Sequence, residues 1–92
     1  MVAEKELTTQ NVIQEKAVII ERHLHLVANA TRKYKDTGVN ALDLISIGIV
    51  GLVKAINALD NMEQSDLSEY LSNGIENEIT IFLSNIGGSS RL

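Results

Sequence analysis

The sequence predicts an all-α fold, a small bundle of three main helices. Three observations lead to this prediction. Apolar residues recur at spacings of three and four, the period of an α-helix. The chain contains no proline, and its β-branched residues follow helical rather than alternating patterns. With 92 residues, the chain is long enough for one domain with a modest core.

The first helix is predicted from about Val12 to Lys35, after a polar N-terminal lead-in over residues 1–11. Cations in its last turn favour the negative end of the helix dipole. Gly38 can end it in a left-handed conformation. One helical face then carries Ile13, Ala17, Ile20, Leu24, Val27, Thr31 and Tyr34.

The central helix is predicted from Asn40, a good N-cap, to about Leu59, with Asp43 in its first turn. It is too interrupted and too well flanked by polar residues to span a bilayer. One stripe is aliphatic: Ile45, Ile49, Leu52, Ile56 and Leu59. A second stripe consists mostly of small residues, which lets another backbone approach closely: Leu44, Gly48, Gly51, Ala55 and Ala58.

The third helix is predicted from about Leu67 to Ile86, after a polar connector over residues 60–65. Ser65 or Asp66 caps it. Gly74 is interpreted as an interior glycine that costs about 1 kcal/mol against alanine, and the spacing leaves open whether the helix kinks there. Residues 87–92, which begin with two glycines, are predicted to be a flexible C-terminal tail, so the domain covers residues 12–86. The inward residues are Leu67, Leu71, Ile75, Ile79, Phe82 and Ile86.

The residues that carry chemistry predict neither an enzyme nor a metal or cofactor site. The chain has no cysteine, and His23 and His25 are two apart, a spacing that does not place them together on one helical face. Ser89 and Ser90 have no neighbouring group that would activate a nucleophile. The charged N-terminus lacks the order of a signal peptide, so we expect a cytoplasmic protein without a membrane partner.

Charge is distributed unevenly along the chain. From Asp60 onward there are six acidic residues and one basic residue, Arg91, within a formal net charge of −4. Phosphate binding requires cations, so this third of the chain is a poor phosphate-binding surface unless its acids face away.

The two stripes leave a mixed, mostly aliphatic face of the central helix without an assigned partner. Its members are Leu42, Asp43, Ser46, Ile47, Val50, Val53 and Asn57. The residues alone leave three readings open: the flanking helices cover this face, a second copy covers it in a homodimer, or it docks on another protein.

Three segments resemble region 2 of bacterial RNA polymerase sigma factors. Residues 23–34 are similar to a family stretch in which N-L-R-L-V precedes a basic pair and a tyrosine. Residues 42–60 are similar to a second family segment, which consists of D-L-I, then a glycine, then I-G-L-I-K-A-I and an aspartate. Tyr70 and the run from Ile75 to Ile79 resemble the end of that region. The match covers Glu21 to Leu83, in register, and is closest to the sporulation branch.

The resemblance implies a helical bundle that docks on the clamp helices of the RNA polymerase β′ subunit. By position, polymerase binding falls to residues of the central helix, and we call them the docking surface: Leu42, Asp43, Ser46, Ile47, Val50 and Val53. Ile49 lies between this surface and the core stripe, and the sequence does not assign it. In the family, the next segment melts and reads the promoter −10 element.

Departures from the family pattern predict weakened contacts with promoter DNA. Where the family's connector has an aromatic, a proline, a glycine and basic residues, this chain has Leu59, Asn61, Glu63, Gln64 and Asp66. Asn73 and Gly74 occupy positions that often hold tryptophans or a basic residue. Stacking of a base on an aromatic ring contributes about 1–3 kcal/mol, and here only Tyr70 offers a ring. The expected weak DNA contacts are Tyr70, Asn73 and Asn77.

Three functional hypotheses follow. The first is a sigma-type subunit of transcription initiation, without a region 4, which acts alone, with a second protein that supplies region 4, or as a fragment of a longer sigma factor. The second is a regulator that binds polymerase and competes with active sigma factors. The third is a homodimerising structural bundle.

Overall fold

The computed structural model describes residues 2–59 and 66–90, with side chains for residues 14–59 and 66–86. This part of the chain contains three α-helices and no strand: α1 (Val2–Lys33), α2 (Ala41–Asn57) and α3 (Leu67–Ser90), with a short 3-10 turn, η1 (Lys35–Thr37), between the first two. The predicted all-α bundle is confirmed. None of these described helices is long and apolar enough to cross a membrane.

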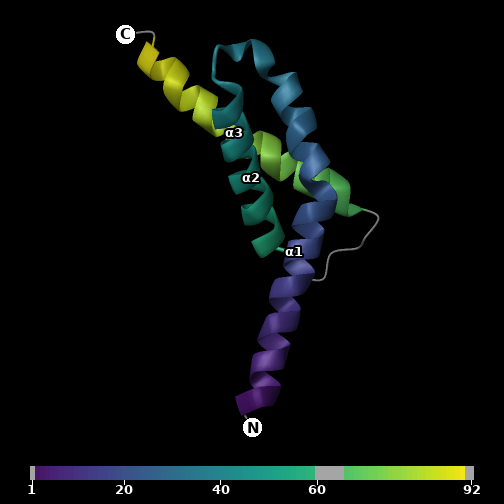
Figure 1. Cartoon of the computed structure of the whole chain (residues 1–92). Helices are drawn as coiled ribbons and strands as arrows, with labels where there is room; N and C mark the ends of the chain where they lie inside the picture. Colours follow the sequence, from purple (N-terminus) through teal and green to yellow (C-terminus); the bar gives the residue numbers. More distant parts are fainter. Residues whose placement is uncertain (1, 60–65, 91–92) are drawn as a thin grey trace.

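The helices form two layers (Figure 1). α1 and α2 run side by side in opposite directions, and α3 lies across one face of this pair. The opposite face of the α1–α2 pair is not covered by another helix of the described chain. The N-terminal part of α1 extends past the other two helices.

The turn between α1 and α2 contains the two predicted cap residues, although α1 ends at Lys33 rather than near Lys35 and η1 separates it from Gly38. Gly38 has φ 86°, a left-handed conformation that glycine adopts without a Cβ clash. The Asn40 side chain caps α2 by accepting a hydrogen bond from the Leu42 backbone N–H at 2.7 Å. These two residues set the direction in which α2 returns along α1.

Glycines allow α2 to lie close to both neighbouring helices. A Cβ built on Gly51 would lie 2.8 Å from the Gly74 carbonyl oxygen and 2.9 Å from the Ile75 Cα. A Cβ built on Gly48 would lie 2.9 Å from Cγ1 of Val27 on α1. α3 continues as an α-helix through Gly74. The glycine therefore allows close approach rather than ending or interrupting the helix.

The core lies where α3 crosses the other two helices. It consists of Val27, Ala30, Leu44, Leu52, Ala55, Ile56, Leu67, Leu71, Ile75 and Ile79. The small-residue stripe of α2 thus contributes as much to the core as the aliphatic stripe does. Most of the core residues predicted around the crossing are confirmed.

Several residues predicted to point inward are exposed instead. Leu24 and Ile86 remain 42% and 37% exposed, and Ala17 and Ala58 are also exposed. Ile49, which the sequence left unassigned, is 37% exposed. The cause is the oblique path of α3, which covers the middle of the α1–α2 pair on one side only. Helical spacing identifies an apolar face, but it does not show how far a neighbouring helix covers that face.

Helix ends differ from the prediction. α1 begins at Val2 rather than near Val12, because the Ala, Glu, Lys and Gln residues there are good helix formers and extend a helix once it exists. α3 continues past Gly87 and Gly88 to Ser90, since an interior glycine weakens a helix without forbidding it. The predicted connector over residues 60–65, with its cap Ser65, lies outside the described residues, as do residues 91 and 92.

Candidate functional site

All six residues of the docking surface lie on α2. Leu42 and Val50 are 71% and 45% exposed, and Asp43 and Ser46 are also exposed. Ile47 and Val53 are half-buried. Aliphatic side chains thus remain accessible on α2 from Leu42 to Val53, although the fold buries six other residues of the same helix.

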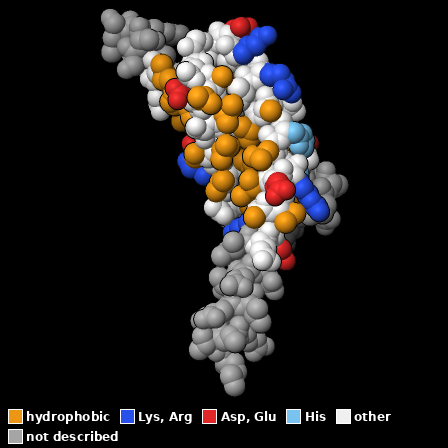
Figure 2. Space-filling view, viewed as in Figure 1, with side chains coloured by type: hydrophobic (Ala, Val, Ile, Leu, Met, Phe, Trp, Pro, Cys, Tyr) orange, Lys and Arg blue, Asp and Glu red, His pale blue; other side chains and the backbone are white. Residues whose placement is uncertain are grey.

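The docking surface divides into an open half and a flank. The helical period places Leu42, Ser46 and Val53 on the side of α2 opposite the glycines that contact α3. Figure 2 shows a band of hydrophobic side chains over this uncovered face of α1 and α2. Ile49, which the helical period places beside Leu42 and Val53, is also exposed, as is Leu24 of α1. Asp43, Ile47 and Val50 lie on the flank of α2 nearer to α3.

Local hydrogen bonds hold the start of the docking surface in place. The Asn40 cap fixes the first turn, and the Ser46 hydroxyl donates to the Leu42 carbonyl at 2.9 Å. Asp43 lies in the first turn, where its charge complements the positive end of the helix dipole. Within the described part of the chain, Asp43 forms no ion pair. Its carboxylate is therefore available to a cation on a partner.

The predicted DNA-contacting residues lie together in an open groove between α2 and α3. The α2–α3 groove has a volume of about 500 Å³. The Tyr70 hydroxyl donates a hydrogen bond to the Ala55 carbonyl at 3.0 Å, which holds the half-buried ring against α2. The residues that line the groove are Gly51, Lys54, Ala55, Tyr70, Asn73, Gly74, Asn77 and Glu78.

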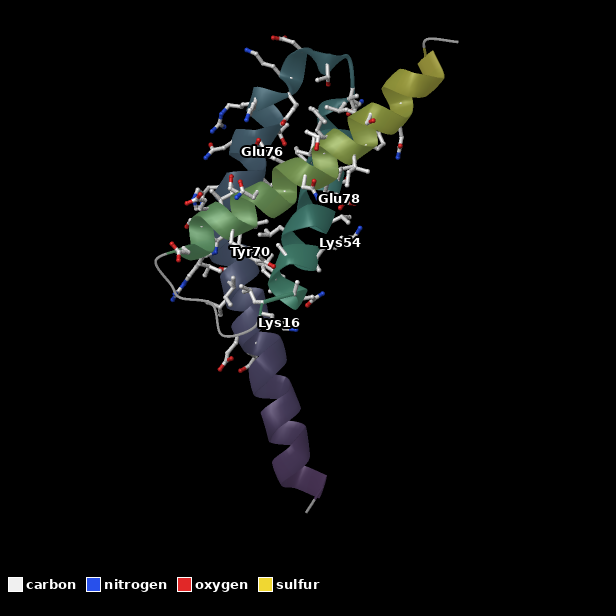
Figure 3. All side chains as sticks on the ribbon, turned by 180° about the vertical axis from the view of Figure 1, so that it is seen from behind. Lys16, Lys54, Tyr70, Glu76 and Glu78 are labelled. Atoms are coloured by element: carbon white, nitrogen blue, oxygen red, sulfur yellow. The ribbon has the colours of Figure 1, made fainter. Side chains whose placement is uncertain are left out.

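Lys54 and Glu78 form an ion pair across this groove. Nζ of Lys54 lies 3.1 Å from Oε2 and 3.3 Å from Oε1 of Glu78. Figure 3 shows the two side chains on α2 and α3 near the crossing, with Tyr70 nearer to the start of α3. Asp66 and Glu69 line an adjoining hollow with Tyr70 and Asn73. The groove therefore has a positive group that is already paired and additional acids at one end.

Glu76 has a different role from Glu78, although the two are neighbours on α3. Oε1 of Glu76 accepts hydrogen bonds from Lys33 Nζ at 2.7 Å and from the Tyr34 hydroxyl at 3.4 Å. The hydrogen bond and the charge of Glu76 raise the pKa of Lys33 above its ordinary value. Glu76 thus links α3 to the end of α1, away from the groove.

A small apolar notch adjoins the groove, and the sequence did not predict it. It has a volume of about 190 Å³ and is lined by Ile47, Val50, Glu78, Ile81, Phe82 and Asn85. Ile81 is 50% exposed. Ile81 is not one of the inward residues that helical spacing predicts for the third helix. This spacing was the feature of the sequence that could have shown that Ile81 faces outward. Because Glu78 lines both hollows, the docking surface and the groove form one continuous surface.

The two histidines lie on α1, and neither belongs to the docking surface or lines the α2–α3 groove. Nδ1 of His23 is 2.8 Å from the Ile19 carbonyl, and Nδ1 of His25 is 3.1 Å from the Arg22 carbonyl. In the described part of the chain, no three His, Asp or Glu side chains gather where they could hold a metal ion.

Comparisons with known proteins give one consistent result. The family model for sigma-70 region 2 matches residues 19–85. The RNA polymerase sigma-E factor of Clostridium acetobutylicum is 46% identical over 68 residues, which are 74% of this chain and 29% of that protein. The sigma-28 factor of Bacillus thuringiensis subsp. kurstaki is 42% identical over 78 residues, 85% of this chain and 33% of that protein.

The sigma-K factor of Bacillus subtilis is similar over nearly the same segment. It is 40% identical over 76 residues, 83% of this chain and 26% of that protein. The chain therefore spans about a third or less of the length of these relatives. All six docking residues, and Tyr70, Asn73 and Asn77, lie within the segment that the family model matches.

Proposed function

The chain belongs to the sigma-70 region 2 family, in the sporulation-type branch that its sequence indicated, and we propose that it acts in transcription initiation by binding core RNA polymerase through the docking surface. The observation that carries this proposal is the exposure of aliphatic residues along α2, next to a face of the bundle that no described helix covers.

The chemistry of the docking surface supports a helical protein partner. Leu42 and Val50 expose apolar area. When another protein covers this area, its removal from water favours binding by roughly 25 cal/mol per Å². Contiguous exposed apolar area typically marks an interaction site. Asp43 adds a carboxylate that is unpaired in the described chain and favours a partner with an Arg or Lys. The clamp helices of the β′ subunit are the partner we propose.

We further propose that promoter contacts through the α2–α3 groove are weak. Tyr70 is half-buried and its hydroxyl is bonded to Ala55, so only part of the ring is available for stacking. Asn73 and Asn77 offer hydrogen bonds without charge. The paired Lys54 and the acids near Tyr70 oppose the approach of a phosphate.

The acidic surroundings of the groove favour a second candidate function. A protein that binds polymerase but engages −10 DNA poorly would compete with active sigma factors. Both candidates use the docking surface, so the same binding experiment tests their common premise. Homodimerisation through the open face is the alternative that does not involve polymerase.

The experiment is capture of a β′ clamp-helix fragment by the 92-residue chain. We expect wild-type protein to bind, and Asp43→Lys to weaken binding by on the order of 2–5 kcal/mol if the carboxylate pairs with a buried cation. Asp36→Lys is the matched control, because Asp36 is exposed on η1 outside the docking surface. Thermal unfolding checks that Asp43→Lys has lost only the modest dipole contribution of about 0.3–1 kcal/mol.

Absence of binding by the wild-type chain would contradict both polymerase proposals, and sedimentation equilibrium would then test the homodimer. If the chain does bind, promoter opening separates initiation from competition. An initiation factor forms open complexes that Tyr70→Ala reduces and that Tyr70→Phe, which keeps the ring, largely retains. A competitor forms none and lowers initiation by another sigma factor.

A further inference from the structure

Lys54 and Glu78 meet across the α2–α3 groove from two different helices. Both carboxylate oxygens of Glu78 lie within 3.3 Å of Nζ of Lys54. Among the described residues that line the groove, Lys54 supplies the positive charge and Glu78 the negative charge. A phosphate that enters this groove would need the same ammonium group that Glu78 already contacts.

The position of the pair suggests a role other than holding the helices together. The side chain of Lys54 is 67% exposed and that of Glu78 is 23% exposed. The pair is therefore open to solvent on its lysine side, and solvent screening keeps its contribution to stability small. The close approach of α2 and α3 depends instead on the glycine contacts of Gly51 and Gly74. The carboxylate charge of Glu78 can therefore be removed without loss of the fold.

We infer that Glu78 restricts nucleic-acid binding in the α2–α3 groove, because its carboxylate occupies Lys54 and competes with a backbone phosphate of single-stranded DNA. This inference rests on the proposed DNA contact of the groove and names a residue that limits it. Glu78 also lines the notch beside Ile47 and Val50 of the docking surface. The restriction therefore acts at the junction between the docking surface and the groove.

Glu76 provides a matched control on the same helix. It is also a glutamate in an ion pair with a lysine, but its partner is Lys33 at the end of α1. Glu76→Gln and Glu78→Gln remove the same charge in side chains of equal size. A difference between the two variants therefore reports the position of the charge and not the net charge of the protein.

The experiment measures binding of a fluorescently labelled, A/T-rich single-stranded oligonucleotide to the 92-residue chain by anisotropy over a salt series. We expect Glu78→Gln to tighten binding about two- to fivefold at low salt, the range that loss of an exposed competing pair implies. One additional phosphate contact steepens the salt slope by about 0.7. Glu76→Gln should change affinity by a clearly smaller factor, and Lys54→Met combined with Glu78→Gln should abolish the gain.

Equal gains for Glu76→Gln and Glu78→Gln would overturn the inference, since net charge would then explain both. A gain that persists when Lys54 is replaced by Met would overturn it as well. If neither wild type nor Glu78→Gln binds the oligonucleotide, Glu78 is not the restricting group and the inference fails. Capture of the β′ fragment by Glu78→Gln is measured in a separate assay. Failure of the inference about Glu78 can therefore be distinguished from failure of the polymerase proposal.

Discussion

Gly74 of α3 lies so close to Ala55 of α2 that a Cβ built on Gly74 would come within 2.8 Å of the Ala55 Cβ. The Ala55 carbonyl oxygen accepts the hydrogen bond from Tyr70, which is also on α3. The separation of the two helices at this point therefore determines both the packing of the core and the depth of the groove. A change in either residue should affect the other.

Gly74→Ala should destabilise the protein. The cost of overpacking, about 1–3 kcal/mol, exceeds or matches the stabilisation of about 1 kcal/mol that alanine gives through its higher helix propensity. Ala55→Gly should also destabilise it, through lost propensity and a lost buried methyl group. The double variant with both changes exchanges the methyl group between the helices and should lie close to wild type. Urea unfolding followed by circular dichroism measures the three free energies. Additive losses in the double variant would contradict direct contact.

Leu42 and Leu44 are two residues apart on α2 and should behave in opposite ways. Leu44 is 1% exposed, so Leu44→Ala should reduce the free energy of unfolding by about 2–5 kcal/mol. Leu42 is 71% exposed, so Leu42→Ala should change it by less than about 0.5 kcal/mol. The same Leu42→Ala protein should bind the β′ fragment more weakly. Unchanged binding would remove Leu42 from the docking surface.

The Lys33–Glu76 pair predicts a loss of stability at alkaline pH. Hydrogen bonding and the charge of Glu76 raise the pKa of Lys33 above its ordinary value of 10.5. A raised lysine pKa means that the folded protein holds this proton more tightly than the unfolded chain does. The contribution is fully present below the ordinary lysine pKa and is lost as the pH rises through the raised value.

Unfolding of wild type and Glu76→Gln over roughly pH 8 to 12 tests this. The difference in unfolding free energy should be constant at the lower end and shrink above the ordinary lysine pKa. Lys33→Gln in the Glu76→Gln background should add no further pH dependence. A difference that remains constant to the upper end would show that the pair does not stabilise the fold.

Local features of the fold could be predicted from the sequence because they depend on near neighbours. Asn40 caps α2 and Gly38 adopts a left-handed conformation as expected, since both depend on a few adjacent backbone groups. The buried positions Leu52, Leu71 and Ile75 followed from helical spacing. The resemblance to the family assigned the docking residues to one helix. That these residues bind polymerase stays a prediction.

Other features required the arrangement of the helices. Ile49 could not be assigned from its spacing, and it is 37% exposed because α3 crosses the opposite side of α2. The roles of Glu76 and Glu78 could not be separated either, because their partners, Lys33 and Lys54, are distant in the sequence. The contribution of Ile81 to the notch likewise depends on where α3 passes α2.

The sequence by itself determined the three helices, the Asn40 cap of α2, the left-handed conformation of Gly38, the residues able to form a core and the family to which the chain belongs. These features follow from a 3.6-residue period and from backbone hydrogen bonds between near neighbours. Only the tertiary structure decided which face of α2 stays open, how Gly74 meets Ala55, and which glutamate faces Lys54. These relationships depend on where α3 crosses α2, and that crossing is set by packing between residues far apart in the chain.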